Sequence, residues 1–143
     1  MIFLLFFSLI QEGDEIIIIE PFFQYFYFNA KMAGAKLKFC EMIPKNGEWT
    51  IDFEKLEGLF SAKTKLIIIN SPHNPTGKVF TKEELLRIRE ILMKFPNVLV
   101  LADEVYEKCV LDKTDFPRIA SFDENMWMRT ITIMSSGKVY LQN

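Results

Sequence analysis

Three short segments of this sequence carry side chains that could do chemistry, and each follows an apolar run. In chain order the segments are NPTG (74–77), DEVYE (103–107) and SSGK (135–138). Their polar side chains include those of Asn74, Asp103, Tyr106, Ser135 and Lys138. An amide, a carboxylate, a phenol and a hydroxyl can bind a polar ligand, and an amine can also act as a nucleophile. Lys138 is therefore either a surface charge or a nucleophile held at a ligand site.

The apolar runs have the composition of buried β-strands. LIIIN (66–70), VLVLA (98–102) and TITIM (130–134) precede the three segments, and EIIIIE (15–20) is a fourth run of the same kind. Short, continuous runs rich in β-branched residues are typical of parallel strands covered on both faces. AKLKFCEM (35–42) alternates instead, which predicts a shorter and more peripheral strand.

Helical patterns separate these strands. We expect an aromatic-rich helix within residues 22–36 and a short helix that begins after Asp52 as its N-cap. The clearest helix covers residues 81–95, where Thr81 and Glu84 have the spacing of a capping box. Strands that alternate with helices predict an α/β fold of three layers, in which helices cover both faces of a mostly parallel sheet.

Parallel strands would bring the three segments together. Open α/β sheets bind ligands beyond the carboxyl ends of their strands, so Asn74, Asp103 and Lys138 should gather around one cleft. This placement does not name the ligand. The sequence contains neither common phosphate-binding fingerprint, and it lacks the G-x-S-x-G elbow that a serine hydrolase would need alongside His73.

Composition disfavours several other classes of protein. A formal net charge of -2 gives no electrostatic case for binding nucleic acid. Cys40 and Cys109 are isolated and His73 is the one histidine, so we expect no metal centre. Both cysteines should be small buried side chains of a protein in a reducing compartment, the cytoplasm, with mitochondria as the alternative.

The apolar start of the chain could suggest a signal peptide or a membrane segment. Residues 1–10, MIFLLFFSLI, are too short to cross a bilayer, which argues against a membrane protein. They have neither a preceding basic residue nor a small-residue cleavage site after them. We expect the end of a buried helix, with Gly13 ahead of the next strand.

In their order, NPTG, DEVYE and SSGK resemble the fold-type I pyridoxal-phosphate enzymes, and the class I/II aminotransferases are the most similar set. Longer stretches, such as PHNPTGKVFTKEEL and MWMRTITIMSSGK, are similar to the kynurenine aminotransferases and cysteine-S-conjugate β-lyases of this family. The resemblance spans nearly the whole chain. It implies pyridoxal 5'-phosphate as cofactor, amino acids of the aromatic, kynurenine or sulfur type as donors, and 2-oxo acids as acceptors. It also implies a possible β-lyase side activity and, for whole relatives, a homodimer.

The resemblance also implies a role for each candidate residue. Lys138 would attach the cofactor covalently and carry the proton during transfer. Asp103 would pair with the ring nitrogen and keep it protonated, which makes the cofactor an electron sink. Asn74 and Tyr106 would hydrogen-bond the phenolate oxygen of the cofactor. Two further residues complete the cofactor-binding set: Phe23 would stack on the ring, and Ser135 would donate to the phosphate.

The pattern of the family extends past both ends of this sequence. A small-residue and tyrosine turn would lie upstream, whereas a second phosphate ligand and the arginine that binds the substrate carboxylate would lie downstream. We therefore expect residues 1–143 to be a partial cofactor-binding large domain, truncated at both ends and without the small domain. Two hypotheses stay open, an aminotransferase and a catalytically inactive fragment that binds the cofactor weakly or acts only as an interaction module. Uncovered strand edges and the apolar start predict aggregation.

Overall fold

Runs of isoleucine, leucine and valine form the centre of the molecule. The computed structural model describes residues 2–110 and 116–140. Its six-stranded sheet has the order β3-β2-β1-β4-β5-β6, in which β3 is antiparallel to β2 and all other neighbours are parallel. The strands are β1 (Glu15–Glu20), β2 (Lys36–Lys45), β3 (Glu48–Ile51), β4 (Thr64–Asn70), β5 (Leu99–Asp103) and β6 (Thr130–Ile133).

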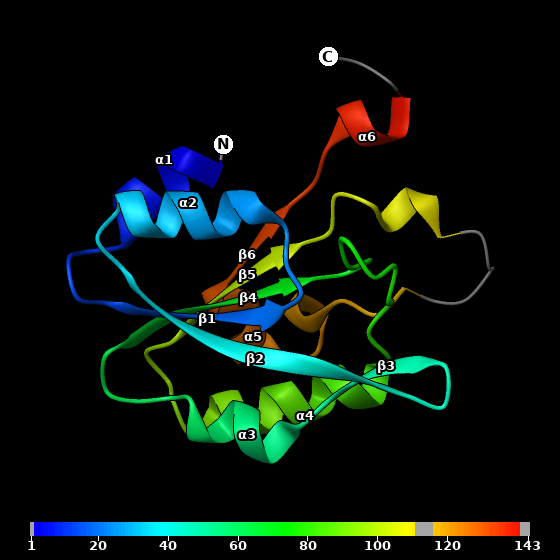
Figure 1. Cartoon of the computed structure of the whole chain (residues 1–143), viewed down its shortest axis with the longest axis horizontal. Helices are drawn as coiled ribbons and strands as arrows, with labels where there is room; N and C mark the ends of the chain where they lie inside the picture. The colour runs from blue at the N-terminus through cyan, green and yellow to red at the C-terminus, as the bar shows by residue number, and fades with distance from the viewer. Residues whose placement is uncertain (1, 111–115, 141–143) are drawn as a thin grey trace.

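Helices cover both faces of this sheet, which confirms the predicted three-layer α/β fold. Helices α1 and α2 lie on one face, while α3, α4 and α5 lie on the other, and α6 extends beyond the end of β6 (Figure 1). The α-helices are α1 (Ile2–Leu9), α2 (Gln24–Met32), α3 (Phe53–Gly58), α4 (Lys82–Met93), α5 (Glu124–Arg129) and α6 (Ser136–Tyr140). Two short 3-10 turns are η1 (Glu107–Cys109) and η2 (Ile119–Ser121).

Alternate residues of each central strand enter different cores. Ile17 and Ile19 of β1 pack in the core beneath α3 and α4, whereas Ile16 and Ile18 pack in the core beneath α1 and α2. Each isoleucine that is fully buried contributes about 1.5–3 kcal/mol of transfer free energy. The strands are apolar on both faces because both faces are covered, as their composition predicted.

The predicted caps are present. The Thr81 hydroxyl accepts a hydrogen bond from the Glu84 amide at 3.2 Å, and the Glu84 carboxylate accepts one from the Thr81 amide at 2.9 Å. The Asp52 carboxylate accepts a hydrogen bond from the Lys55 amide at 2.9 Å at the start of α3. Each cap satisfies a backbone donor that the helix itself leaves without a partner.

The strand predicted at residues 35–42 is present and lies toward one side of the sheet, but the prediction that it is short was wrong. Strand β2 has 10 residues, and it continues through a tight turn into the antiparallel strand β3, which was not predicted. Asn46 and Gly47 form the turn with positive φ angles of 54° and 83°. An Asn-Gly pair is a strong hairpin signal because both central residues of the favoured turn need positive φ.

Two predictions of burial also need correction. Cys40 is buried as expected, but Cys109 is exposed at the end of η1. In helix α1 only Phe6 is buried, whereas Phe3, Leu4 and Phe7 are exposed, so the helix is not a buried one. Among the described residues, no helix is long and apolar enough to cross a membrane.

Candidate functional site

The strand pairing brings the ends of β4, β5 and β6 to one edge of the sheet. Asn70 pairs with Asp103, and Asp103 pairs in turn with Ile133 of β6. The carboxyl ends of the three strands therefore lie side by side, as predicted from the sequence (Figure 1). Asn74, Tyr106 and Lys138 follow these ends within a few residues, so the fold places all three at this edge.

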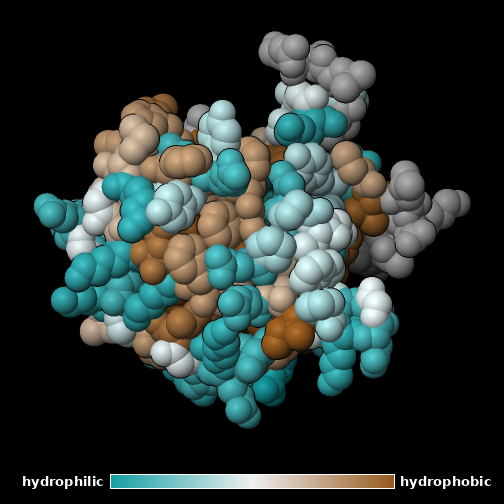
Figure 2. Space-filling view, in the orientation of Figure 1, coloured by the Kyte–Doolittle hydropathy of each residue, from teal (hydrophilic) through white to brown (hydrophobic). Residues whose placement is uncertain are grey.

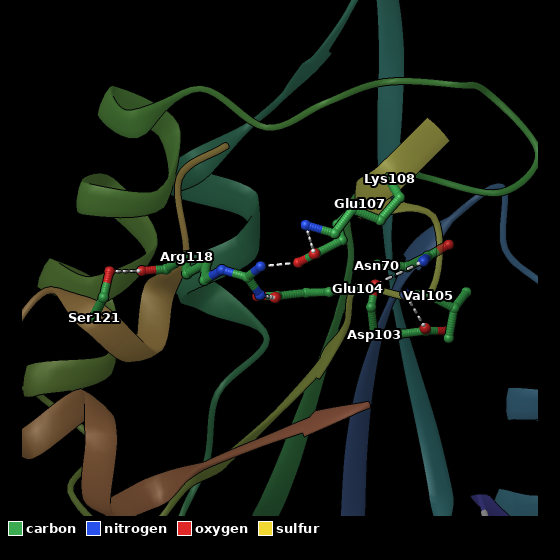
Figure 3. Close-up of polar contacts among 8 residues, drawn as sticks. All are labelled: Asn70, Asp103, Glu104, Val105, Glu107, Lys108, Arg118 and Ser121. Carbon is green, nitrogen blue, oxygen red and sulfur yellow. Dashed lines mark hydrogen bonds and ion pairs between the residues drawn. The ribbon is translucent and has the colours of Figure 1, made fainter. Parts of the chain in front are cut away.

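Asn70, which was not among the predicted residues, joins the first two strand ends. Its Nδ2 donates to the carbonyl oxygen of Asp103 at 2.9 Å, and its Oδ1 accepts from the amide of Asn74 at 2.7 Å. The Ser71 amide also donates to the Asp103 carbonyl, at 3.0 Å. Figure 3 shows the Asn70 side chain directed at Asp103. Asn74 and Asp103 are thus linked through one side chain.

The turn that carries Asn74 is held by hydrogen bonds to His73. The His73 amide donates to the Lys78 carbonyl at 2.8 Å, and the Gly77 amide donates to the His73 carbonyl at 2.7 Å. The His73 ring is buried and its Nδ1 lies 2.9 Å from the Thr76 hydroxyl. Burial lowers the pKa of His73 to about 4, so its ring is neutral at physiological pH.

Asp103 is a buried carboxylate with few partners. Its residue is 4% exposed, and its Oδ1 accepts a hydrogen bond from the Val105 amide at 3.3 Å (Figure 3). Burial raises the pKa of Asp103 above its ordinary value, and none of the basic side chains in the described ranges forms an ion pair with it. A buried carboxylate of this kind is suited to a cationic N–H donor, which would favour its charged form.

Tyr106 and Lys138 meet beyond the ends of β5 and β6. Lys138 Nζ lies 5.6 Å from the centroid of the Tyr106 ring, within the range of a cation–π contact. The Lys138 amide contacts the Ser135 hydroxyl at 3.4 Å. Lys138 itself is exposed and belongs to α6, whose backbone extends away from the sheet (Figure 1). Its amine is therefore accessible to a ligand.

Three hollows open beside these residues. One of about 310 Å³ is lined by Asn74, Tyr106, Cys109 and the residues around Pro75. Another, of about 250 Å³, has Ser135 and Ser136 in its wall, and a third, of about 640 Å³, also reaches Ser135. A hollow of about 880 Å³ lies between α4 and η2, and none of the candidate residues line it. We assign the chemistry to the hollows that adjoin the strand ends.

Phe23 lies at the same edge but packs with aromatic side chains of its own helix. It follows β1 directly as the N-cap residue of α2, and it is 37% exposed. Its ring stacks on Tyr25 with centroids 5.0 Å apart and meets Phe26 edge-on at 6.0 Å. In the described part of the chain, Phe23 forms no aromatic contact with the residues that follow β4, β5 and β6.

A cluster of charged side chains forms ion pairs with the two glutamates of the DEVYE segment. Glu104 and Glu107 are both buried, and the guanidinium of Arg118 forms an ion pair with each of them (Figure 3). Lys108 Nζ lies 3.0 Å from Glu107 Oε1. These residues were not predicted. No sequence signal marked the ion pairs, because the partner arginine lies 14 residues beyond Glu104.

The family model for aminotransferase class I and II matches residues 1–141. The chain therefore belongs to the class I and II aminotransferases. It is 42% identical to kynurenine–oxoglutarate transaminase of Dictyostelium discoideum, over 93% of this chain and 34% of that protein. It is 43% identical to kynurenine–oxoglutarate transaminase 3 of Homo sapiens, over 93% of this chain and 31% of that protein.

Solved structures agree with this assignment. The crystal structure of Bna3p, a putative kynurenine aminotransferase from Saccharomyces cerevisiae, matches with a TM-score of 0.88 and 42% identity, covering 96% of this chain and 34% of that one. Cystalysin from Treponema denticola, whose structure contains a pyridoxal 5'-phosphate cofactor, matches with a TM-score of 0.89 and 31% identity, covering 98% of this chain and 36% of that one. The chain thus spans about a third of the length of these relatives.

Proposed function

We propose that residues 1–143 form the cofactor-binding part of the large domain of a pyridoxal-phosphate-dependent aminotransferase. The observation that carries the proposal is the buried carboxylate of Asp103, which has no ion-pair partner among residues 2–110 and 116–140, at the edge where Asn74, Tyr106, Ser135 and Lys138 follow neighbouring strands. Family membership and the cofactor in the cystalysin structure support it.

Each residue in the described site has a chemical task in this proposal. Pyridoxal phosphate, when bound, supplies a protonated ring that withdraws electrons from the α-carbon of an amino acid. The Asp103 carboxylate would accept a hydrogen bond from the ring N–H, and this positive partner would offset the cost of its burial. The Asn74 amide and the Tyr106 hydroxyl would donate to the phenolate oxygen.

Ser135 and Lys138 would act from the segment that follows β6. The Ser135 hydroxyl would donate to the phosphate group, and the Lys138 amine would attach the cofactor and carry the proton during transfer. Lys138 lies beside the Tyr106 ring, which supports a shared role for the two residues. We propose that Phe23, from the loop after β1, stacks on the cofactor ring.

The proposed substrates follow from the relatives. Their names pair kynurenine with oxoglutarate, so we propose an aromatic, kynurenine-type or sulfur-containing amino acid as donor and a 2-oxo acid as acceptor. Cysteine-S-conjugate β-lyase activity would be a side reaction of the same site. We also propose that the whole protein is a cytoplasmic homodimer.

Reductive trapping tests the proposal. Pyridoxal phosphate followed by borohydride should fix the cofactor mainly on Lys138, as read by peptide mapping, and Lys138→Ala should remove that adduct. Surface lysines also react slowly, so the controls are Lys36, Lys38 and Lys63 of the same chain. Label spread evenly over these four lysines would refute the assignment. Selective label without amino-group transfer would identify a cofactor-binding chain that is catalytically inactive.

A further inference from the structure

We propose that Asn70 is a positioning residue that sets the distance between Asn74 and Asp103. The inference rests on the proposed function and concerns the same site. Asn70 is the last residue of β4 and is 4% exposed, so its side chain has no access to solvent. It would not touch the cofactor, and it would act through the two residues on either side of it.

The geometry requires both halves of the Asn70 amide. Nδ2 donates to the Asp103 carbonyl at 2.9 Å, while Oδ1 accepts from the Asn74 amide at 2.7 Å. A carboxylate at this position could accept from Asn74 but could not donate to Asp103. An alanine could do neither, and both backbone groups would lose a partner inside the protein.

The turn after β4 depends on the hydrogen bond from the Asn74 amide to the Asn70 side chain. Pro72 and Pro75 flank the Asn74 segment and have no amide hydrogen to donate. The amide of Asn74 is therefore one of few donors with which the turn can attach to the sheet, and it binds Asn70.

The distance matters because the two linked residues serve opposite parts of one ring. In the proposed function Asp103 meets the ring nitrogen and Asn74 meets the phenolate oxygen. A rigid ring accepts both only if the spacing of the two groups matches it, and a misplacement of about 1 Å can cost about 100-fold in rate. The Asn70 side chain links the backbones that carry these two groups, and the Ser71 amide adds a second hydrogen bond to the Asp103 carbonyl.

Hydrogen exchange read by mass spectrometry tests the link without cofactor. In Asn70→Ala, peptides that cover residues 71–77 should exchange about tenfold faster, the effect of one lost hydrogen bond. The matched control is Thr64→Ala at the opposite end of β4. Thr64 is equally buried at 5%, and its hydroxyl accepts from the Ser61 amide at 2.9 Å and contacts Glu15 Oε2 at 3.3 Å. That variant should leave residues 71–77 unchanged.

Trapping with pyridoxal phosphate and borohydride tests the consequence for the site. Relative to the unsubstituted chain at the same pH, Asn70→Ala and Asn70→Asp should each reduce selective label on Lys138 by about tenfold at neutral pH. As the pH falls, the selective label on Lys138 should recover only in Asn70→Asp, because a protonated carboxyl can again both donate and accept a hydrogen bond.

Each outcome decides one of the two proposals. Unchanged exchange in Asn70→Ala, or equal acceleration in Thr64→Ala, would overturn the positioning role. Selective label on Lys138 that is the same in both Asn70 variants and in Thr64→Ala at every pH would also overturn it. If the unsubstituted chain shows no preference for Lys138, the proposed function fails, and the exchange experiment alone then decides whether Asn70 positions the turn.

Discussion

Asp103 has opposite expected effects on stability and on cofactor binding. Its pKa is raised by burial, so its favourable contribution belongs to the protonated form. That contribution is complete below the ordinary unfolded value of about 4 and is lost as the pH rises through the raised folded pKa. At neutral pH, well above the ordinary unfolded value, Asp103 therefore lowers the stability of the cofactor-free chain.

We predict that Asp103→Asn makes the cofactor-free chain more stable at neutral pH and weakens retention of pyridoxal phosphate. The amide keeps an oxygen that can accept from Val105, but it carries no charge for a cationic partner. Urea unfolding and dialysis after loading measure the two effects. A variant that is less stable and retains the cofactor would contradict the assigned role of Asp103.

His73 should control the acid side of the stability profile. Its pKa is lowered by burial to about 4, so the neutral ring stabilises the fold. This contribution is complete above the unfolded value of about 6.5 and is lost as the pH falls from there to the folded pKa. We predict that unfolding free energy declines between these pH values and that His73→Gln removes that part of the slope, as measured by chemical denaturation at successive pH values.

At the scale of elements, the DEVYE segment (103–107) is held by ion pairs to Arg118, a residue outside the segment. Arg118 neutralises Glu104 and Glu107, and without it Glu104 would be buried with no ion-pair partner among the described residues, while Glu107 would keep only the exposed Lys108. We predict that Arg118→Met costs about 3–5 kcal/mol of unfolding free energy. Arg87→Met is the control, because Arg87 forms an exposed pair with Glu90 at 3.7 Å and should cost at most about 1 kcal/mol. Equal losses of unfolding free energy in the two variants would show that the ion pairs of Arg118 do not stabilise the DEVYE segment.

Elements were predictable where the signal is local. The strands at 15–20 and 66–70 have continuous apolar runs, and the caps at Asp52 and Thr81 act on amides three residues away. Strand β3 was missed although an Asn-Gly pair marks its turn. The prediction relied instead on the alternating apolar pattern of the preceding strand.

The site was predictable only in part for a physical reason. Parallel pairing gathers the residues that follow strand ends, so Asn74 and Asp103 could be placed together from the order of the elements. The contacts of Arg118 and Asn70 depend on side-chain geometry across segments far apart in sequence, which no local pattern contains. Phe23 and Tyr25 are close in sequence, and their stacking was missed because it depends on side-chain conformation, which the sequence pattern does not contain.

On the scale of the whole molecule, apolar side chains gather on one outer face. Figure 2 shows apolar residues over α1 and α2. The exposed side chains there are Phe3, Leu4, Phe7, Tyr25, Phe28 and Met32. Of these side chains, Phe3, Tyr25, Phe28 and Met32 line a hollow of about 640 Å³ that also reaches Met134 and Ser135 after β6. An exposed apolar surface of this kind promotes association.

We predict that the chain self-associates through this face. Sedimentation velocity should show concentration-dependent species larger than a monomer, and Leu4→Lys together with Phe28→Lys should reduce them. Met93→Lys, an exposed residue of α4 on the opposite side of the sheet, is the control and should have little effect. A monodisperse monomer before any substitution would contradict the prediction.

The position of His73 gives this protein a built-in reporter. It is the sole histidine of the sequence, and its ring contacts Thr76 inside the turn that carries Asn74. A proton NMR spectrum would therefore contain one set of imidazole signals, which belongs to His73 without assignment by mutation. Any ligand that settles against Asn74 should shift them, so the chain can be screened for occupants of this turn one spectrum at a time.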